Sequence, residues 1–371
     1  MPESLTPVPF LDLSAAFGEL EAEWFARIRE SGARGSFILG PNVTAFEEEV
    51  ARYIGVKHAI GVANGTDALW LALRALGIGP GDEVITTPFT FFATSEAVDV
   101  VGATPVFADI EADSFCLDPE SVARKITPRT KAIIPVHIFG HPARMAAIMA
   151  IARDHKLAVV EDCAQAFGAR AGGNVVGSIG DAGAFSFYPT KVLGCYGDGG
   201  LITTNRDDVN EHIRRLRNHG ATSPFMHAEV GCNSRLDEVQ AALLRLKLAC
   251  IEVDIAARQQ VAARYTALLA GLPVTPPALP SGGRHAFNLY TARWSRRDAL
   301  RAALTEAKIG TSQCYPMGNH LQAVYRHLGY KPGSLPVCEH ACTETLSLPI
   351  YPGMPAAHAA RVVEVIRAVI G

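Results

Sequence analysis

Residues 58–87, HAIGVANGTDALWLALRALGIGPGDEVITT, contain a complete strand–helix–strand unit. The apolar run HAIGVA predicts a strand, which Asn64-Gly65 interrupts before the helical stretch TDALWLALRAL. The glycine- and proline-rich segment 77–81 ends that helix, and EVITT predicts the next strand.

The same alternation continues along the chain. TPVFAD precedes a predicted helix near 118–125, KAIIPV precedes one near 143–154, and the strand LAVVED follows. Strands that alternate with helices of this length predict an α/β fold, with a mostly parallel sheet covered by helices on both faces. Ligands of such sheets bind beyond the carboxyl ends of the strands. That edge would carry Gly65-Thr66, residues 89–91, His137 and Asp162.

The segments around this core predict further elements and a second domain. Two pairs at capping-box spacing, Thr44 with Glu47 and Ser234 with Asp237, predict helix starts. The second helix would run, with a bend, to about residue 270, before the proline- and glycine-rich connection 272–287. Shorter elements follow it. We therefore expect a large domain over residues 1–250 and a smaller C-terminal α+β domain over 251–371.

Composition narrows the class of protein. The chain has 371 residues, 49% hydrophobic and 19% charged, with a net charge of −3, so we expect neither nucleic acid nor a membrane as partner. Because the N-terminus lacks a signal-peptide pattern and the eight cysteines form no CxxC pair, we expect a cytoplasmic protein with reduced thiols. The run VCEHAC at 337–342 could supply zinc ligands, but a packed helix is the favoured interpretation, so no metal is predicted.

One lysine has unusual neighbours. Lys191 lies in GDAGAFSFYPTKVLGCYGDGG, residues 180–200, between aromatic and small residues and ahead of four glycines. A partly desolvated amine has a lowered pKa and can form a Schiff base, and glycines let the backbone approach a bulky ligand. A plain loop lysine or an anion contact is the alternative.

A carboxylate ends the buried strand LAVVED. Asp162 at this position could hold a protonated ring nitrogen, and Gln165 would lie on the same side, one helical turn later. A structural N-cap is the alternative for Asp162, and Glu161 is the competing carboxylate.

Three further features fit a phosphorylated, flat ligand. Gly65 and Thr66 open a helix after a strand, where free backbone N–H groups suit a phosphate, and Ser186 could add a hydroxyl. Phe91 could stack on a flat ring. Together with Lys191 and Asp162 these residues favour a pyridoxal 5'-phosphate (PLP) site over any of the separate alternatives.

The sequence resembles the DegT/StrS family of sugar-nucleotide aminotransferases, PLP enzymes of fold type I. The similar stretches include FILGPNVTAFEEEVARYIGVKHAIGVANGTDALWLALRALGIGPGDEVI, VVEDCAQAFGA, GDAGAFSFYPTKVLGCYGDGG and GCNSRLDEVQAA. They cover most of residues 8–245, while the C-terminal third resembles the family more loosely.

The resemblance implies a role for each matching residue. Lys191 resembles the Schiff-base lysine, Asp162 the partner of the pyridine nitrogen, and Gln165 the neighbour of the ring hydroxyl. The implied phosphate-binding and stacking set is Gly65, Thr66, Ser186 and Phe91. Asn233 resembles an asparagine that reaches the phosphate from the other subunit, which implies a homodimer with shared active sites.

The implied reaction is ping-pong transamination, in which L-glutamate converts PLP to pyridoxamine 5'-phosphate and a nucleotide-linked keto-sugar then receives the amine. The motifs resemble members acting at C3 of a UDP- or dTDP-linked hexose more than members acting at C4. Where the family often has His-Tyr-Pro, this chain has Cys314-Tyr315-Pro316, so its sugar could differ. Candidate substrate contacts are Arg235, Tyr315 and His320.

The sequence leaves two other functions open. Another PLP reaction, such as decarboxylation or aldol cleavage, could use the same fold, and a non-catalytic sensor could retain it. The lysine at position 191 argues against the dehydratases of the family, which carry histidine there.

Overall fold

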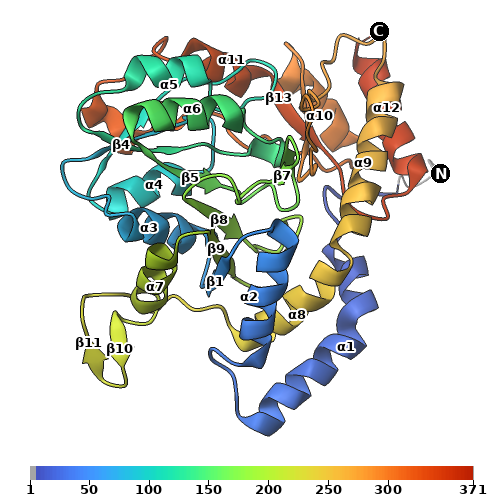
Figure 1. Ribbon diagram of the computed structural model, residues 1–371. Helices are drawn as coiled ribbons and strands as arrows, with labels where there is room; N and C mark the ends of the chain where they lie inside the picture. Colours follow the sequence, from blue (N-terminus) through green and yellow to red (C-terminus); the bar gives the residue numbers. More distant parts are fainter. Residues whose placement is uncertain (1–5, 371) are drawn as a thin grey trace.

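A computed structural model describes residues 6–370 (Figure 1). The large sheet contains β1 (His58–Val62), β2 (Glu83–Thr86), β3 (Thr104–Phe107), β4 (Thr130–Ile134), β5 (Ala158–Asp162), β8 (Ala182–Ser186) and β9 (Gly200–Thr204). Short pairs are formed by β6 (Arg170–Ala171) with β7 (Asn174–Val175), β10 (Ala221–Ser223) with β11 (Met226–His227), and β12 (Tyr290–Arg293) with β13 (Thr345–Leu348).

The helices before residue 250 are α1 (Leu13–Arg34), α2 (Pro41–Ile54), α3 (Gly65–Ala75), α4 (Ala93–Val100), α5 (Pro119–Lys125), α6 (Met145–His155), α7 (Asp207–Leu216) and α8 (Glu238–Ala249). Those after it are α9 (Ile251–Leu268), α10 (Arg297–Glu306), α11 (Pro336–Glu344) and α12 (Ala356–Ile370). Three 3₁₀ helices are η1 (Ile138–Gly140), η2 (Asn319–Leu321) and η3 (Ala323–Leu328). Within residues 6–370, none of these helices is both long enough and apolar enough to cross a membrane.

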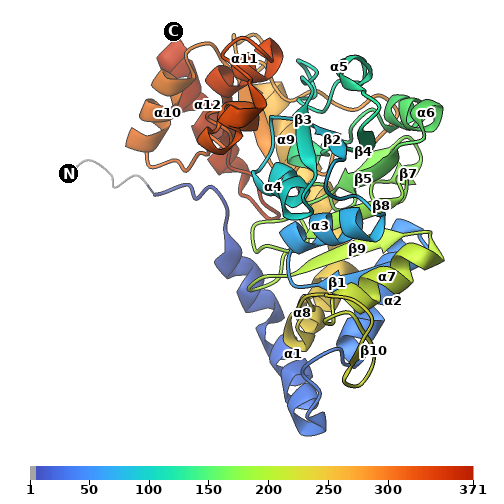
Figure 2. The same cartoon turned by 90° about the vertical axis from the view of Figure 1, so that its left-hand side faces the viewer.

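The expected mostly parallel sheet is confirmed. Its strand order is β1-β9-β8-β5-β4-β2-β3, and only the pairings of β9 with β8 and with β1 are antiparallel. Side chains alternate between two buried faces, as in β4, where Ile133 joins the core beneath α5 and α6 and Ile134 joins the core beneath α3, α4 and α7. Helices therefore cover both faces, as Figure 2 shows.

The antiparallel strand β9 brings three segments together at one edge of the sheet. Gly200, its first residue, is opposite both Val62 at the end of β1 and Ser186 at the end of β8. A Cβ at position 200 would lie 2.3 Å from the carbonyl oxygen of Asn64, so only glycine fits this approach. The start of α3 consequently lies beside the end of β8.

The C-terminal third has a core of its own around β12 and β13, packed against α9, α10 and α12. Val8 joins this core and pairs with Ile309, so the N-terminal segment packs with the C-terminal third. Tyr315, Tyr325 and the buried side of α11 pack instead against the large sheet. The domain boundary at residue 250, where α8 gives way to α9, stays a prediction.

Both predicted capping pairs are wrong. Helix α2 starts at Pro41, and Glu47 instead accepts hydrogen bonds from Arg217, Arg214 and the amide of Gly61. Helix α8 starts at Glu238, and Ser234 donates to Asp67. In both cases the side chain that the local pattern assigns to a helix cap hydrogen-bonds instead to a polar group that is distant in the sequence.

Candidate active site

Asp162 is the buried carboxylate at the end of β5. One oxygen accepts a hydrogen bond from the Thr94 hydroxyl at 2.7 Å, and the other accepts from the Ala164 amide at 3.1 Å. Burial raises the pKa of Asp162 despite these donors. A cationic partner would reverse this effect, because it would favour the ionised carboxylate.

Glu161, the competing carboxylate, points to the opposite face of the sheet. Its oxygens accept hydrogen bonds from the backbone amides of Gly177, Ile179 and Gly180, and it contacts His137 Nε2 at 3.0 Å. These partners hold the pKa of Glu161 below its usual range although burial opposes them. Glu161 is therefore fully engaged in the fold, which leaves Asp162 as the carboxylate of the site.

His137, Glu161 and Cys163 lie close enough together to hold a metal ion, the one such group among residues 6–370. The ring nitrogens of His137 are already engaged, since Nδ1 accepts from the Ala143 amide at 2.9 Å and Nε2 contacts Glu161. Because the oxygens of Glu161 are also occupied, this group has the bonding of a structural network. His137, which the sequence places on the rim, is a buried part of that network.

Lys191 follows β8 in the loop that precedes the glycine-rich segment. Burial lowers the pKa of its amine, while the nearby carboxylate of Asp162 raises it. The net shift is downward, which increases the fraction of neutral, nucleophilic amine near neutral pH. The structure thus brings the predicted lysine and the predicted carboxylate together.

Gly65, Thr66 and Ser186 meet where α3 begins. A Cβ at position 65 would lie 2.6 Å from the Ser186 Cβ, so these two backbones are in close contact. Asn64 caps the helix by accepting from the Asp67 amide, while the amides of Gly65 and Thr66 lie in the first turn, where no intrahelical acceptor exists. This helix start has the features of an anion site beside a hydroxyl.

A short hydrogen-bonded chain fixes Gln165. Its Oε1 accepts from the Phe139 amide at 2.9 Å, so its Nε2 is the donor to the Tyr315 hydroxyl at 2.6 Å. Tyr315 stacks on Phe139 with ring centroids 5.9 Å apart. The Tyr315 oxygen is thereby an acceptor toward Gln165, and its own hydrogen is free to be donated elsewhere.

Lys191, Gln165 and Tyr315 line a cavity of about 280 Å³. From the strand ends it is lined by Phe91, Gln165, Thr190 and Lys191. From the C-terminal third it is lined by Asn288, Ser312, Cys314 and Tyr315. The Phe91 side chain is 65% exposed, which is unusual for an aromatic ring and leaves its face available to a ligand.

Seven predicted site residues are not among the described residues that line this cavity: Gly65, Thr66, Asp162, Ser186, Asn233, Arg235 and His320. Asn233 is exposed before α8, and Arg235 contacts Asn218 at 3.3 Å. His320 is buried against Phe107 and pairs with Glu339 at 3.2 Å. The structure therefore does not place His320 in the lining of this cavity, and its contact with a substrate stays a prediction.

The cysteine-rich run on α11 does not form one cluster. Cys338 and Cys342 face the core, whereas His340 is exposed and pairs with Glu344.

A second cavity, of about 300 Å³, lies between α2, β1 and α7, where Arg214 and Arg217 both pair with Glu47.

Four of the contributors to the site that the sequence did not indicate are Thr94, Ser312, Asn288 and Phe10. The Thr94 hydroxyl donates a hydrogen bond to Asp162. Ser312 and Asn288 line the cavity, as does Phe10 from the N-terminal segment. Thr94 lies one helical turn from a predicted rim residue, but the other three come from segments without a recognisable motif. Only the fold brings them to the strand ends.

The residues present fit PLP. The buried Asp162 keeps a raised pKa although Lys191 is nearby, and a protonated ring nitrogen would favour its ionised form; Lys191, whose amine has a lowered pKa, lines the cavity. The helix start at Gly65 suits a phosphate, and the exposed ring of Phe91 suits a flat heterocycle.

Residues 19–367 match the DegT/DnrJ/EryC1/StrS aminotransferase family. Among similar proteins, the "Pleiotropic regulatory protein" of Geobacillus stearothermophilus is 48% identical, over 93% of this chain and 94% of that protein. The UDP-N-acetyl-3-dehydro-alpha-D-glucosamine 3-aminotransferase of Acidithiobacillus ferrooxidans is 45% identical, over 98% of both chains. The dTDP-3-amino-3,4,6-trideoxy-alpha-D-glucose transaminase of Streptomyces venezuelae is 46% identical, over 97% of this chain and 95% of that protein.

The fold is similar to that of a solved structure. DesV of S. venezuelae superposes with a TM-score of 0.95 at 46% sequence identity, over 98% of both chains.

Proposed function

Because the chain belongs to the DegT/DnrJ/EryC1/StrS aminotransferase family, we propose that it transfers an amino group from L-glutamate to C3 of a nucleotide-linked keto-hexose. The enzyme is a PLP-dependent transaminase of the sugar-nucleotide class. The observation that carries the proposal is the single cavity in which Lys191, Gln165 and Phe91 meet at the strand ends beside Asp162. The relatives named for chemistry at C3 of UDP- and dTDP-linked sugars support the position and leave both nucleotides as candidates.

In this proposal each residue of the site has one task toward the cofactor. Lys191 Nζ would hold its aldehyde carbon, Asp162 its ring nitrogen, and Gln165 the ring hydroxyl through the second hydrogen of Nε2. Gly65, Thr66 and Ser186 would hold the phosphate, and Phe91 would lie against the ring. When bound, PLP withdraws electrons from the carbon that carries the amino group and stores that group between the two half-reactions.

Lys191 also moves the proton. In the donor half-reaction Nζ would take the proton from the α-carbon of L-glutamate, which requires the neutral amine. Burial supplies this form by lowering the pKa of Lys191. Asp162, ionised against a ring cation, would keep that cation in place throughout.

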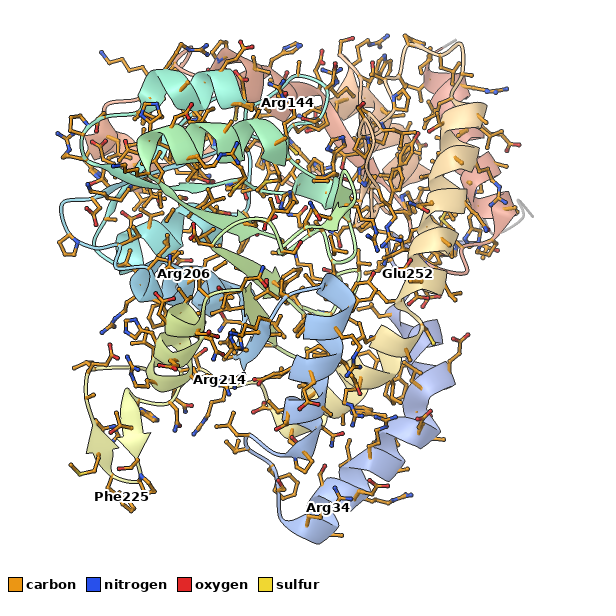
Figure 3. The ribbon with its side chains drawn as sticks, in the orientation of Figure 1. Arg34, Arg144, Arg206, Arg214, Phe225 and Glu252 are labelled. Atoms are coloured by element: carbon orange, nitrogen blue, oxygen red, sulfur yellow. The ribbon has the colours of Figure 1, made fainter. Side chains whose placement is uncertain are left out.

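The proposal includes a homodimer with shared sites. The exposed large apolar side chains include Leu13 and Phe25 on α1, residues 37–39, and Phe225 and Met226 of the β10–β11 hairpin, where Phe225 is 95% exposed and lies at the outer tip (Figure 3). Patches of this kind are typical of subunit interfaces. Asn233 and Arg235, which lie outside the cavity lining of their own chain, would then reach the cavity of the partner.

Subunit mixing tests the shared site. Lys191→Ala and Asn233→Ala subunits are each expected to be nearly inactive as homodimers. Mixed in equal amounts, they should regain about a quarter of the wild-type sites, because half of the dimers then carry one intact site of two. No recovery in dimers that exchange subunits would contradict the shared site but leave the reaction itself intact.

Half-reactions test the reaction. L-Glutamate should convert the bound PLP to its pyridoxamine form, and a panel of UDP- and dTDP-linked 3-keto and 4-keto hexoses should be screened for restoration of the PLP spectrum. We expect restoration by a 3-keto sugar. A decarboxylase or an aldolase would not complete this cycle, and a non-catalytic sensor would not enter it.

A further inference from the structure

Asn288 is a buried side chain that the fold itself leaves without a partner. It is 6% exposed, and its Oδ1 has no hydrogen-bond donor among residues 6–370. The backbone around it is held by other groups: the Leu289 amide donates to Phe139 O at 3.2 Å and the Ala286 amide donates to Gly140 O at 2.9 Å. The amide side chain of Asn288 is thus not needed to hold this segment.

Neighbouring buried polar groups contrast with Asn288. Thr291, three residues later, pairs with the Ser347 hydroxyl at 2.8 Å, and His285 Nδ1 accepts from the Phe287 amide at 2.9 Å. Four other buried side-chain atoms lack partners in the described chain: Tyr196 Oη, Arg258 Nε, Tyr265 Oη and His320 Nδ1. None of those four residues lines the cavity that contains Lys191, whereas Asn288 does. An unpaired amide at this place indicates a ligand that completes it.

The hydrogen-bonding capacity of the Asn288 amide limits the kinds of ligand that could pair with it. Oδ1 accepts and therefore needs an O–H or N–H donor; the carboxylates of L-glutamate offer none, and its amino group would be bonded to the cofactor in the proposed reaction. A sugar hydroxyl both donates and accepts, so it would satisfy the amide whichever way the Asn288 side chain is turned. The hydroxyls of Ser312 and Thr190 line the same cavity and add further groups suited to a sugar.

We propose that Asn288 is a specificity-determining residue that binds a hydroxyl group of the hexose in the cavity of its own subunit. This inference rests on the proposed function, because it requires the nucleotide-linked sugar as second substrate. Asn288 then has no part in the glutamate half-reaction. A site built to hydrogen-bond a hydroxyl discriminates strongly against a substrate that lacks it, because its own polar group is then left unpaired.

The test compares the two half-reactions in Asn288→Leu, which keeps the size of the side chain and removes its hydrogen bonds. The probes are L-glutamate with the PLP form, and dTDP-3-amino-3,6-dideoxyglucose, its 3,4,6-trideoxy counterpart and UDP-linked 3-amino-N-acetylglucosamine in the reverse direction. We expect kcat/KM for the sugar that wild type prefers to fall about 10- to 100-fold, mainly through KM, while the glutamate step changes less than about twofold. Preference between sugars that differ in hydroxyl groups should weaken in the variant.

Asn288→Ala provides a second variant in case the leucine does not fold, and Thr291→Val is the matched control. Thr291→Val removes a buried hydrogen bond nearby but leaves the cavity unchanged, so it should lower stability without changing either half-reaction. Equal losses in both half-reactions of Asn288→Leu and Asn288→Ala, or no loss in either, would overturn the inference. If wild type reacts with glutamate but with no nucleotide-linked sugar, the proposed function fails and the role of Asn288 falls with it.

Discussion

Replacement of Asp162 by asparagine removes one negative charge from the end of β5 and leaves the shape of the side chain almost unchanged. The hydrogen bonds can be kept, because Oδ1 of the amide still accepts from Ala164. Its Nδ2 can donate to the Thr94 oxygen, whose hydrogen can turn to Thr90 Oγ1, 2.8 Å away. We therefore expect Asp162→Asn to fold.

The stability of the cofactor-free protein should not fall in this variant. Burial raises the pKa of Asp162, so the folded state holds this proton more tightly than the unfolded chain does. A carboxyl group of this kind lowers stability as the pH rises above its unfolded pKa, near 3.8. At neutral pH the uncharged asparagine removes that cost, and the melting temperature without cofactor should stay equal or increase.

The catalytic effect should be large. Removing one partner of a buried, hydrogen-bonded charge pair costs about 2–5 kcal/mol. If Asp162 keeps a proton on the ring nitrogen, this cost corresponds to a loss of roughly 30- to 5,000-fold in the rate of the glutamate half-reaction. Stopped-flow absorbance of the bound cofactor after mixing with L-glutamate measures it directly.

Glu161→Gln is the matched control, one residue earlier on the opposite face of the sheet. It removes the charge that accepts from three backbone amides and from His137, so it should lower the melting temperature clearly while folded enzyme keeps its rate within a few-fold. The reasoning is refuted if Asp162→Asn reacts with glutamate at the wild-type rate, or if Glu161→Gln loses the rate and Asp162→Asn loses only stability.

Three further predictions concern the same site. Lys191→Ala should abolish turnover and the visible absorbance of covalently held cofactor, and a spectrum identical to wild type would count against the assignment. Gly65→Ala should weaken PLP binding about tenfold or more, because the new Cβ would lie 2.6 Å from the Ser186 Cβ. A fluorescence titration with PLP measures the affinity, and an unchanged value would argue against the phosphate site. Glu161 has a lowered pKa, so its contribution to stability is present above its unfolded value of 4.5 and lost as the pH falls through its folded pKa; thermal unfolding between pH 3 and 7 should show a steeper acid loss in wild type than in Glu161→Gln.

The sequence predicts the large sheet well, because it depends on local patterns, and the same patterns place the predicted site residues at the strand ends. Asp162 and Gln165 follow a buried strand, and Gly65 follows another, so the carboxyl ends of the strands bring them together. Lys191 is predicted from its desolvating neighbours, and burial indeed lowers its pKa. The antiparallel direction of β9 has no local signal, because only its pairing with β1 and β8 defines it.

The predictions that failed depend on partners distant in sequence. Glu47 has the spacing of a capping residue, but it accepts a hydrogen bond from Arg217, which is 170 residues away along the chain. His320 pairs with Glu339 and packs against the ring of Phe107, neither of which the local sequence indicates, and its role as a substrate contact stays a prediction. Asn288 lies in the unremarkable run HAFNLY, and its unpaired amide is evident only once the cavity is formed.

The most direct test of amino transfer to C3 follows the nitrogen atom from L-glutamate to the sugar. The enzyme is incubated with ¹⁵N-labelled L-glutamate and a UDP- or dTDP-linked 3-keto hexose, and the nucleotide-linked product is examined by NMR. We expect ¹⁵N bonded to C3 of the hexose, with Lys191→Ala giving no labelled sugar. A label at C4, or ¹⁵N that leaves glutamate without appearing on any sugar, would contradict it.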